Sequence, residues 1–427
     1  MGNSSRRAGR SLAVACIGVM TLATACGGSA GSAGSDGDAV VLEFQQWWEP
    51  ELPDGMLRGL VDQFEEENPG VTVELLSGPY ASTKEQITAG AASGTMSDVV
   101  GLDGAWVDEL VDQGAISDLS ALMADAGYDD ADLASQVQVD GATYMIPVAN
   151  FAYMMFTNDD LLSQAGVDAP PQTREEFAAA AEAVASSDAG ASGWVLPLSL
   201  EVPNGVQNDV MSWAWASGGS MLEDGQPDLT GPAVTSAVDF VQELSDDGVL
   251  APGTANLKEQ DKVEEFTNGR VAMMIDSLAH INLIRESDPD LAFSISAVPA
   301  EEGYTGERGI TYASWGVGVS ETSEHPEEAW RLVEFLLGEQ ANGELATAAN
   351  AFPGNTRSVP DYVEGDPAYQ QAFDVWNAGT PVNEFVGLPV AETLMRDFGE
   401  QLQRQLQGEQ TTEATLEQAQ QAWSEEF

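Results

Sequence analysis

The sequence predicts an α/β protein with about two domains, and three observations lead to this expectation. The chain has 427 residues, more than one hydrophobic core usually serves. Its hydrophobic content of 43% and charged content of 20% are those of an ordinary globular protein. In its N-terminal half, strand-like runs alternate with helix-like runs, and this order favours a parallel sheet flanked by helices.

The first residues have the pattern of a signal peptide, which is no part of the fold. Three arginines precede an apolar run, and Cys26 follows that run directly. Residues 22–26 resemble a bacterial lipobox, although Leu22 stands four residues before the cysteine where three is usual. We expect residues 1–25 to be the signal, Cys26 to carry a lipid, and residues 26–38 to form a flexible tether. The alternative is a plain secretory signal with an unmodified cysteine.

Cysteine usage and charge exclude several classes of function. The two cysteines, Cys16 and Cys26, both lie at the signal, so the mature chain is expected to have no disulfide and no thiol chemistry. A formal charge of -55 disfavours nucleic acid, because no basic patch can neutralise phosphates. The acidity indicates either a solvated, salt-tolerant surface or a cationic ligand. After the signal, no apolar run reaches the roughly 18 residues that cross a bilayer.

The first half of the mature chain predicts three strands with helices between them. We expect a helix capped by Asp54 to begin near Met56, with its apolar residues on one face. Ligands bind at the carboxyl ends of strands in such sheets, so Trp47, Trp48 and Asp103 are site candidates by position. The expected strands are 40–44, 71–76 and 98–102. The first expected helix is stopped by residues 68–70, and the next two are 82–93 and 105–113.

A second α/β unit is expected after residues 144–147. Thr173 and Glu176 fit the capping box of a helix that ends near Ser186. Pro326 suits the first turn of a later helix. Further strands are expected at 193–200, 270–275, 294–298 and 310–319, and further helices at 206–216, 232–244, 263–268, 326–337 and within 391–423.

Several phrases, in order along the chain, resemble the extracellular solute-binding proteins of bacterial ABC importers. The family, family 1, includes maltodextrin- and trehalose-type sugar binders. The most specific phrase is Phe266 to Met274, which is close to the family's Phe-x-x-Gly-Lys-x-Ala-Met. Other similar phrases are 98–103 with Trp106 and Gly114, 146–147, 156–166, 171–177, 328–336 and 352–353. Together they cover nearly the whole mature chain.

The resemblance implies the two-lobe periplasmic-binding-protein fold of type II, each lobe a mostly parallel sheet flanked by helices. The chain is then expected to cross between lobes near Pro147, Val298 and Phe352. The N-terminal lobe would comprise 39–147 and 299–352, and the C-terminal lobe 148–298 and 353–427. A ligand in the cleft favours the closed form by its greater affinity for that form.

The resemblance also implies a function. The chain is expected to capture a small carbohydrate and deliver it to the permease subunits of an ABC importer. It would act as a monomer without cofactor or metal, held at the outer face of the cell membrane by the lipid on Cys26. Alternatives are a binder of a polyamine or peptide-like cation, a surface lectin, or a carboxylate-based glycosidase. Other enzymes are disfavoured, because the sequence has no phosphate loop, zinc motif or nucleophile elbow.

A sugar site needs aromatic rings for C–H faces and polar side chains for hydroxyl groups. Trp47 and Trp48 are adjacent in an extended segment, so one is expected to line the cleft while the other packs. Asp103 is either a ligand contact or a helix N-cap. Where the family often has a tryptophan, this chain has Leu278 to His280, and Trp315 is expected to replace it. The full set of candidates is Trp47, Trp48, Glu49, Asp103, Trp106, Asn150, Tyr153, Trp213, Asp276, Ser277, Trp315 and Arg357.

Overall fold

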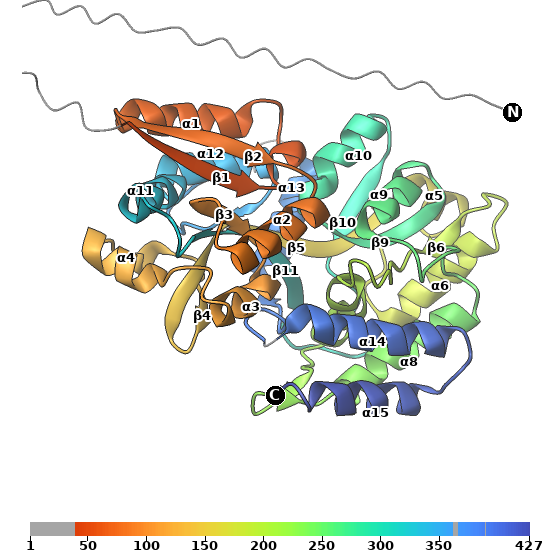
Figure 1. Ribbon diagram of the computed structural model, residues 1–427. Helices are drawn as coiled ribbons and strands as arrows, with labels where there is room; N and C mark the ends of the chain where they lie inside the picture. The colour runs from red at the N-terminus through yellow and green to blue at the C-terminus, as the bar shows by residue number, and fades with distance from the viewer. Residues whose placement is uncertain (1–38, 362–365, 389) are drawn as a thin grey trace, which may run out of the picture. The chain divides into compact units, whose positions relative to one another are not determined.

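Two long strands, β5 (Ala142–Asn158) and β11 (Gly309–Val319), run antiparallel through the middle of the computed structural model (Figure 1). The structure describes residues 39–361, 366–388 and 390–427, and Ala39–Phe427 form one compact unit. The expected signal, the tether and Cys26 lie outside the described residues. The fold is therefore built outward from these two central strands.

The sheet is mixed, with parallel pairs towards both ends and antiparallel pairs in the centre. On one side of β11, strand β1 lies between β2 and β3 and is parallel to both. On the far side of β5, β9 pairs antiparallel with β5 and parallel with β6. The strand order is β2 (Val71–Ser77), β1 (Val40–Gln46), β3 (Val99–Leu102), β11, β5, β9 (Val271–Ser277) and β6 (Ser192–Trp194). Short strands β4 (Val137–Val139), β10 (Phe293–Ser296) and β12 (Phe352–Pro353) pair with β5, and β13 (Thr380–Val382) pairs with β11.

Six helices surround the β1–β3 end and bury what we call the first core, which includes Phe44, Leu60, Val100 and Trp330. The predicted helix near Met56 is confirmed, but its predicted cap is wrong. Gly55, in the left-handed conformation with φ 76°, stands at the N-cap position in place of Asp54. The helices are α1 (Met56–Glu67), α2 (Tyr80–Ser93), α3 (Val107–Asp112), α4 (Leu119–Ala126), α11 (Pro326–Leu336) and α12 (Glu339–Ala349).

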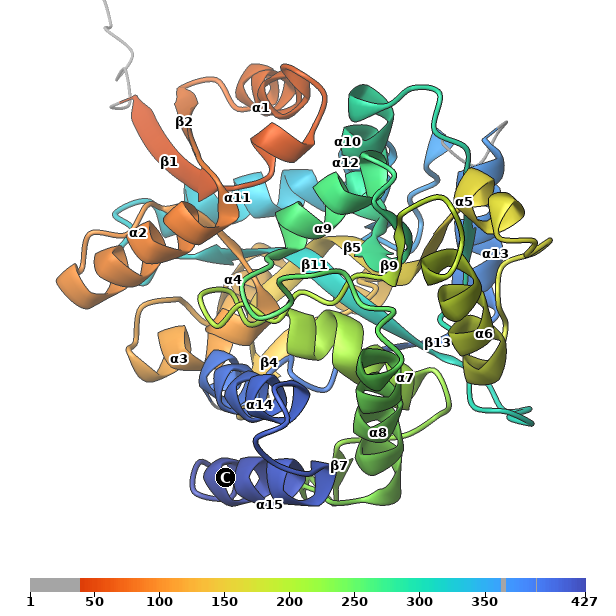
Figure 2. The same cartoon turned by 90° about the vertical axis from the view of Figure 1, so that its right-hand side faces the viewer.

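The helices beyond β5 bury a second core, which includes Phe177, Trp194 and Phe398, and a third cluster, which includes Phe156, Phe266 and Tyr369. The predicted capping box is confirmed, because the Glu176 amide donates to Thr173 Oγ1 at 3.2 Å and the Glu176 carboxylate accepts from the Thr173 amide. Helices α14 and α15 lie side by side at one end (Figure 2). The helices are α5 (Asp159–Gln164), α6 (Arg174–Ala185), α8 (Pro232–Asp246), α9 (Glu259–Thr267), α10 (Ile281–Ser287), α13 (Pro367–Asn377), α14 (Ala391–Leu406) and α15 (Thr412–Trp423).

Strand β5 contributes residues to the first core, to the second core and to the third cluster. Ile146 and Phe151 belong to the first core, whereas Tyr153 and Met155 belong to the second. The strand was not predicted as one element, because nearly all of its residues are buried and it shows no alternation of apolar and polar residues. Its length brings residues of both cores to the same central region.

Two other predicted elements are wrong. The strand expected at 193–200 ends at Trp194, and Pro197 within the rest cannot donate to a strand ladder. The helix expected at 206–216 is instead a π-helical turn, Val206–Val210, followed by the short helix α7 (Met211–Trp215). Single π-turns of this kind are frequent at functional sites.

A glycine makes the approach to this π-turn possible. A Cβ placed at Gly205 would lie 1.6 Å from the Pro197 carbonyl oxygen. We expect Gly205→Ala to lower the free energy of unfolding by about 1–3 kcal/mol, because the backbone must shift. The matched control is Gly59→Ala in α1, where no atom lies within 4 Å. That change should raise stability by up to about 1 kcal/mol. Urea denaturation checks both, and equal effects would contradict the close contact between Gly205 and the Pro197 carbonyl.

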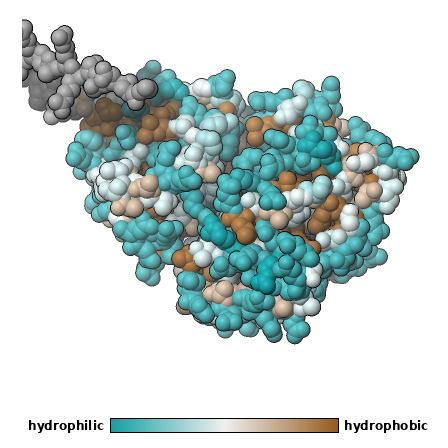
Figure 3. Space-filling model, turned by 45° about the vertical axis from the view of Figure 1, so that its right-hand side comes forward, coloured by the Kyte–Doolittle hydropathy of each residue, from teal (hydrophilic) through white to brown (hydrophobic). Residues whose placement is uncertain are grey.

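The surface is mainly hydrophilic, as Figure 3 shows for one face. Among the described residues, the large hydrophobic side chains that count as exposed are Val41 and Val359. Within the same residues, no helix combines the length and apolar character needed to span a membrane. In the part of the chain that the structure describes, Asp209 and Asp276 are the acidic side chains that count as buried, so the acidity of the chain belongs mainly to its surface.

Candidate ligand-binding cavity

A cavity of about 280 Å³ is lined by residues from both cores. One wall follows strands β1, β2 and β3, the opposite wall comes from the π-turn, α9 and the end of β9, and β5 and β11 close the base. A wider depression of about 650 Å³ beside α12 has no aromatic lining residue. The cavity is lined by Trp47, Glu51, Pro79, Tyr80, Ala81, Asp103, Phe151, Tyr153, Val202, Asn204, Gln207, Asn208, Lys258, Glu259, Gln260, Ser277, Ala279, His280, Ala313, Ser314 and Trp315.

The first wall consists of side chains that follow parallel strands. Trp47 follows β1, Tyr80 follows β2 and Asp103 follows β3. These strands run in the same direction, so their carboxyl ends meet at one edge of the sheet. The Trp47 ring packs edge-on against Tyr80, with ring centroids 5.2 Å apart, and against Trp106 at 5.3 Å. Position relative to a strand end therefore predicted Trp47 and Asp103 as lining residues, and the same signal would have found Tyr80.

Of the two adjacent tryptophans, one lines the cavity and the other packs, although their rings still meet edge-on with centroids 6.2 Å apart. Trp47 lines the cavity, whereas Trp48 is fully buried in the first core. The Trp48 ring stacks on Trp315, with centroids 5.4 Å apart and planes 11° from parallel. Phe151 packs against the same Trp315 ring at 4.7 Å. Trp48 thus holds in place a ring that lines the cavity.

Asp103 is the N-cap of the following turn, as one of the two interpretations predicted, and it also lines the cavity. Its carboxylate accepts a hydrogen bond from the Ala105 amide at 2.9 Å, which caps the following turn. It also accepts from the Tyr80 hydroxyl at 3.0 Å while lining the cavity. Burial raises the pKa of Asp103, and these hydrogen bonds and Lys84 oppose the increase. The carboxylate is therefore fixed in orientation by its own wall.

The π-turn gives the opposite wall its amide groups. Gln207 and Asn208 line the cavity, and Gln207 Nε2 donates to Asn208 Oδ1 at 2.9 Å. The widened turn brings these consecutive residues to the cavity and leaves Asp209 fully buried behind them. A sequence pattern does not reveal such a turn, and neither amide was predicted.

Glu259 is the first residue of α9 and lines the same wall. It accepts a hydrogen bond from the Tyr153 hydroxyl at 2.7 Å. Burial, together with this carboxylate, raises the pKa of Tyr153 well above its usual value, so the phenol stays protonated. The helix was expected to begin only at Val263, and Glu259 was therefore missed. The Lys258 amide donates to the Asp261 carboxylate at 2.8 Å, a local signal that marks the true helix start.

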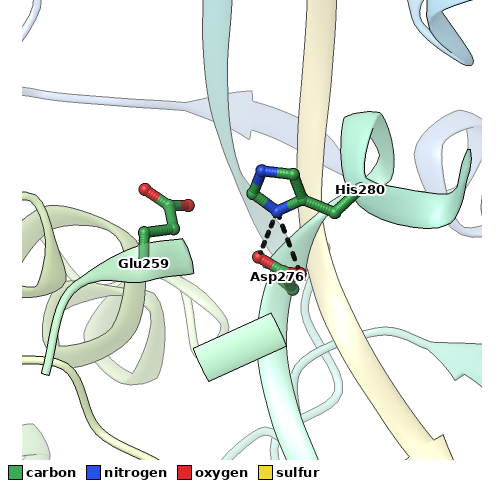
Figure 4. Close-up of side chains that lie close together, drawn as sticks. All are labelled: Glu259, Asp276 and His280. Atoms are coloured by element: carbon green, nitrogen blue, oxygen red, sulfur yellow. Dashed lines mark hydrogen bonds and ion pairs between the residues drawn. The ribbon is translucent and has the colours of Figure 1, made fainter. Parts of the chain in front are cut away.

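A buried network of charged groups supports this wall (Figure 4). His280 Nδ1 lies 3.0 Å from Asp276 Oδ1. Lys262 Nζ lies 3.5 Å from Asp276 Oδ1 and 3.4 Å from Asp209 Oδ2, and it donates to the Ile275 carbonyl. Asp276 and Lys262 are both fully buried. Asp276 was predicted to meet the ligand, but the structure places it behind Ser277 and His280, which line the cavity.

The pKa values in this network follow from burial and pairing. Burial lowers the pKa of His280, but Asp276 more than offsets this and raises it to about 9. Burial raises the pKa of Asp209 to about 8, against the effect of Lys262. Burial alone would raise the pKa of Asp276, but His280 and Lys262 lower it below its usual value. At neutral pH the network therefore contains a protonated His280, a charged Lys262 and an ionised Asp276.

Ligand atoms of Glu259, Asp276 and His280 lie within 4.8 Å of one another, a spacing at which a metal ion could be held. However, the Lys262 ammonium lies 3.5 Å from Asp276, and the His280 proton is held by the same carboxylate. A divalent cation would have to displace that proton and sit beside a buried ammonium. This donor set does not favour a metal, and the network is better described as a charge-balanced support.

Several predicted residues do not reach the cavity. Trp106 packs on Trp47 and Tyr80 from behind. Asn150 is buried in β5, opposite Ser314 of β11. Glu49 accepts a hydrogen bond from the Ser77 hydroxyl and does not line the cavity.

Trp213 and Arg357 lie elsewhere in the fold. Trp213 is fully buried in the second core, where its ring packs 4.9 Å from both Phe177 and Phe240. Arg357 Nε pairs with Asp132 at 3.1 Å, with the arginine side chain 62% exposed. These two were chosen mainly for residue type, and residue type alone did not locate the cavity.

The two sides of the cavity also meet outside it. An ion pair joins Lys84 of α2 to Glu392 of α14, and Arg396 Nη2 lies 2.6 Å from Glu392 Oε1. Lys84 Nζ also lies 5.8 Å from the centroid of the Trp106 ring, which backs Trp47. The cavity is thus enclosed by contacts between helices that belong to different cores.

Comparison with known sequences gives one family and several relatives. The model of the bacterial extracellular solute-binding proteins matches residues 49–343. A binding protein of Brucella abortus is 30% identical over 279 residues, which are 64% of this chain and 66% of that protein, just under two thirds of its length. A probable ABC transporter-binding protein of Deinococcus radiodurans is 25% identical over 247 residues, 56% of this chain and 58% of that protein.

Solved structures share the fold over nearly the whole chain. A Listeria monocytogenes ABC substrate-binding protein in complex with cycloalternan has a TM-score of 0.75 at 18% identity, covering 91% of this chain and 99% of that one. A Thermotoga lettingae solute-binding protein bound with α-D-tagatose has a TM-score of 0.77 at 20% identity, covering 90% and 99%. A cyclic maltosyl-maltose binding protein of Arthrobacter globiformis has a TM-score of 0.74 at 20% identity, covering 90% and 98%. At these identities the likeness establishes the fold, and the fold class predicted from the sequence is confirmed.

Proposed function

The chain belongs to the family of bacterial extracellular solute-binding proteins, and from this premise we propose that it binds a small carbohydrate in the cavity and delivers it to an ABC importer. Membership implies a location outside the cytoplasm. The observation that carries the ligand class is an enclosed space in which aromatic rings and hydrogen-bonding groups are combined. Trp47, Tyr80 and Trp315 offer faces and edges for C–H groups, and Asp103, Asn208 and Glu259 offer acceptors and donors for hydroxyl groups.

The charges around the cavity support a neutral ligand over a cationic one. Each lining carboxylate has a cation near it within the protein. Lys84 acts to lower the pKa of Asp103 against the effect of burial, and Glu259 acts to raise the pKa of Lys262. At the third lining carboxylate, Glu51, His280 acts to lower the pKa against the effect of burial. A polyamine would add positive charge to a site whose carboxylates already have a protein cation nearby, so it would gain less from them than from unpaired acids.

The cavity volume supports a small ligand. Ligand pockets commonly measure about 300–1,000 Å³, and the cavity volume of about 280 Å³ lies just below that range. A monosaccharide or short oligosaccharide is therefore the favoured size. The relatives whose structures contain tagatose or cycloalternan give starting points for a choice of probes.

We propose a monomer that is tethered by a lipid on Cys26, catalyses no reaction, and meets the permease subunits in its closed form. The lobes would comprise 39–147 with 299–352 and 148–298 with 353–427. The distribution of the two cores along the chain supports this division, because between Phe151 and Trp315 the buried residues of the first core include only Ala279.

The test is a ligand screen with the mature chain. Maltose, D-tagatose, cycloalternan, spermidine and a tripeptide are compared by thermal shift, by intrinsic tryptophan fluorescence and by chromatography of the mixture. Our proposal expects a sugar to raise the midpoint by mass action and to change the fluorescence without new products. A shift with spermidine alone would overturn the sugar assignment, and release of shorter saccharides would indicate a glycosidase.

A further inference from the structure

Two ionisable side chains face the cavity from opposite walls. Glu51 ends the short turn Glu49–Glu51 that follows β1, and His280 ends the turn Leu278–His280 that follows β9. Both line the cavity, and each affects the protonation of the other. They therefore approach the same part of the ligand space from the two sides of the fold.

The orientation of His280 is set by its own wall. Its Nδ1 lies 3.0 Å and 3.1 Å from the two Asp276 oxygens, and the ring reaches out beyond that carboxylate (Figure 4). Nε2 makes no hydrogen bond to any residue that the structure describes. Because Asp276 raises the pKa of His280 to about 9, against the effect of burial, the ring is protonated at neutral pH. Nε2 therefore carries a proton that it can donate into the cavity.

Glu51 is the complementary group. Within the described parts of the chain, its carboxylate accepts no hydrogen bond, although the residue is largely enclosed. Burial raises the pKa of Glu51 to about 7, His280 acts to lower it, and Glu259 acts to raise it. At slightly alkaline pH the carboxylate is an acceptor that lacks a donor.

We infer that one hydroxyl group of the bound solute lies between these residues, accepting a hydrogen bond from His280 Nε2 and donating one to the Glu51 carboxylate. This inference rests on the proposed function and specifies the solute that the cavity selects. A hydroxyl can accept and donate at once, whereas an ammonium cannot accept and a carbonyl oxygen cannot donate. Each partner is charged, so both hydrogen bonds are of the stronger, charge-assisted kind. The solute then joins the two walls through a single group.

The inference predicts a pH dependence of binding. The groups that face His280 are Asp276, Glu259 and Glu51, and those that face Glu51 are His280 and Glu259. The arrangement needs Glu51 ionised and His280 protonated, which holds between about pH 7 and pH 9. Affinity should fall as the pH drops below 7, where Glu51 gains a proton. It should fall again above 9, where His280 loses one.

The first experiment needs no ligand. The chain has two histidines, His280 and His325, so a proton NMR titration gives two resonances, and His325→Gln assigns them. We expect Glu51→Gln to lower the pKa of His280, because a facing carboxylate is removed. The control is Glu49→Gln on the same turn, whose carboxylate is bonded to Ser77, and it should leave His280 unchanged. An unchanged His280 in Glu51→Gln would overturn the inference.

The second experiment measures binding of maltose by calorimetry from pH 5 to pH 10, with D-tagatose as the second probe. We expect a bell-shaped affinity in the unmodified chain. Glu51→Gln should weaken binding about tenfold at pH 8 and remove the acid flank, and His280→Gln should remove the alkaline flank. A deoxy sugar that lacks the bridging hydroxyl should bind the unmodified chain and Glu51→Gln equally weakly. If a sugar binds with a flat pH profile, this inference fails while the proposed function stands. If neither sugar binds and only spermidine does, both fail.

Discussion

Replacing Trp47 with alanine is expected to weaken sugar binding by more than tenfold. The ring lines the cavity and is held edge-on by Tyr80 and at a tilt by Trp106, so it is already in place before the ligand arrives. Loss of a buried, pre-positioned aromatic contact typically costs about 2 kcal/mol or more of binding free energy, and 1.4 kcal/mol is a factor of ten. Calorimetry with the sugar that gives the largest thermal shift measures the effect.

Trp48→Ala is the matched control, because the neighbouring ring points into the core. Trp48 is fully buried against Phe44 and Trp315, and its truncation should cost about 3–5 kcal/mol of folding stability. At a temperature where both variants are folded, Trp47→Ala should lose more affinity and Trp48→Ala more stability. The reverse order would mean that Trp48, and not Trp47, contacts the ligand.

The second large effect is expected for Lys262→Met. This ammonium is fully buried between Asp209 and Asp276, and both carboxylates raise its pKa against the effect of burial. Removing one partner of a buried charged cluster leaves the others uncompensated, which costs about 3–5 kcal/mol. Urea denaturation should show this loss. Affinity for sugar should fall as well, because Asp276 orients His280.

Lys258→Met separates this effect from the general loss of a lysine. Lys258 immediately precedes α9 and pairs with Glu201 at 2.8 Å, but its side chain is 36% exposed and that of Glu201 is 69% exposed. An exposed pair contributes at most about 1 kcal/mol. Comparable destabilisation by the two substitutions would show that the buried network does not support the wall.

The sequence predicted the first wall of the cavity better than the second. The position of a residue at a strand end depends only on the order of strands and helices, which periodicity reveals. It located Trp47 and Asp103 in the first wall and Ser277 in the second. It failed for the amides of the π-turn, because their position depends on a local widening of a helix that no periodicity records.

Residue type without position was a weak guide. Trp213 and Trp47 are the same residue type, yet Trp213 packs in the second core, where large aromatic rings bury much apolar area. Glu259 and Lys262 lie three residues apart on α9, and only the tertiary structure shows that one faces the cavity while the other is buried behind it. His280 was noted as a departure from the family pattern, but its partner Glu51 comes from the other end of the fold.

Strand β5 has a consequence for how the molecule unfolds. Its side chains enter both cores along one uninterrupted stretch, with Phe151 in the first core and Tyr153 in the second. Unfolding of one core would displace β5 from the other core as well, because β5 is hydrogen-bonded to β11 on one side and to β9 on the other. The two halves should therefore denature as one cooperative unit, although the chain passes back and forth between them. A substitution in either wall would then shift the stability of the entire body.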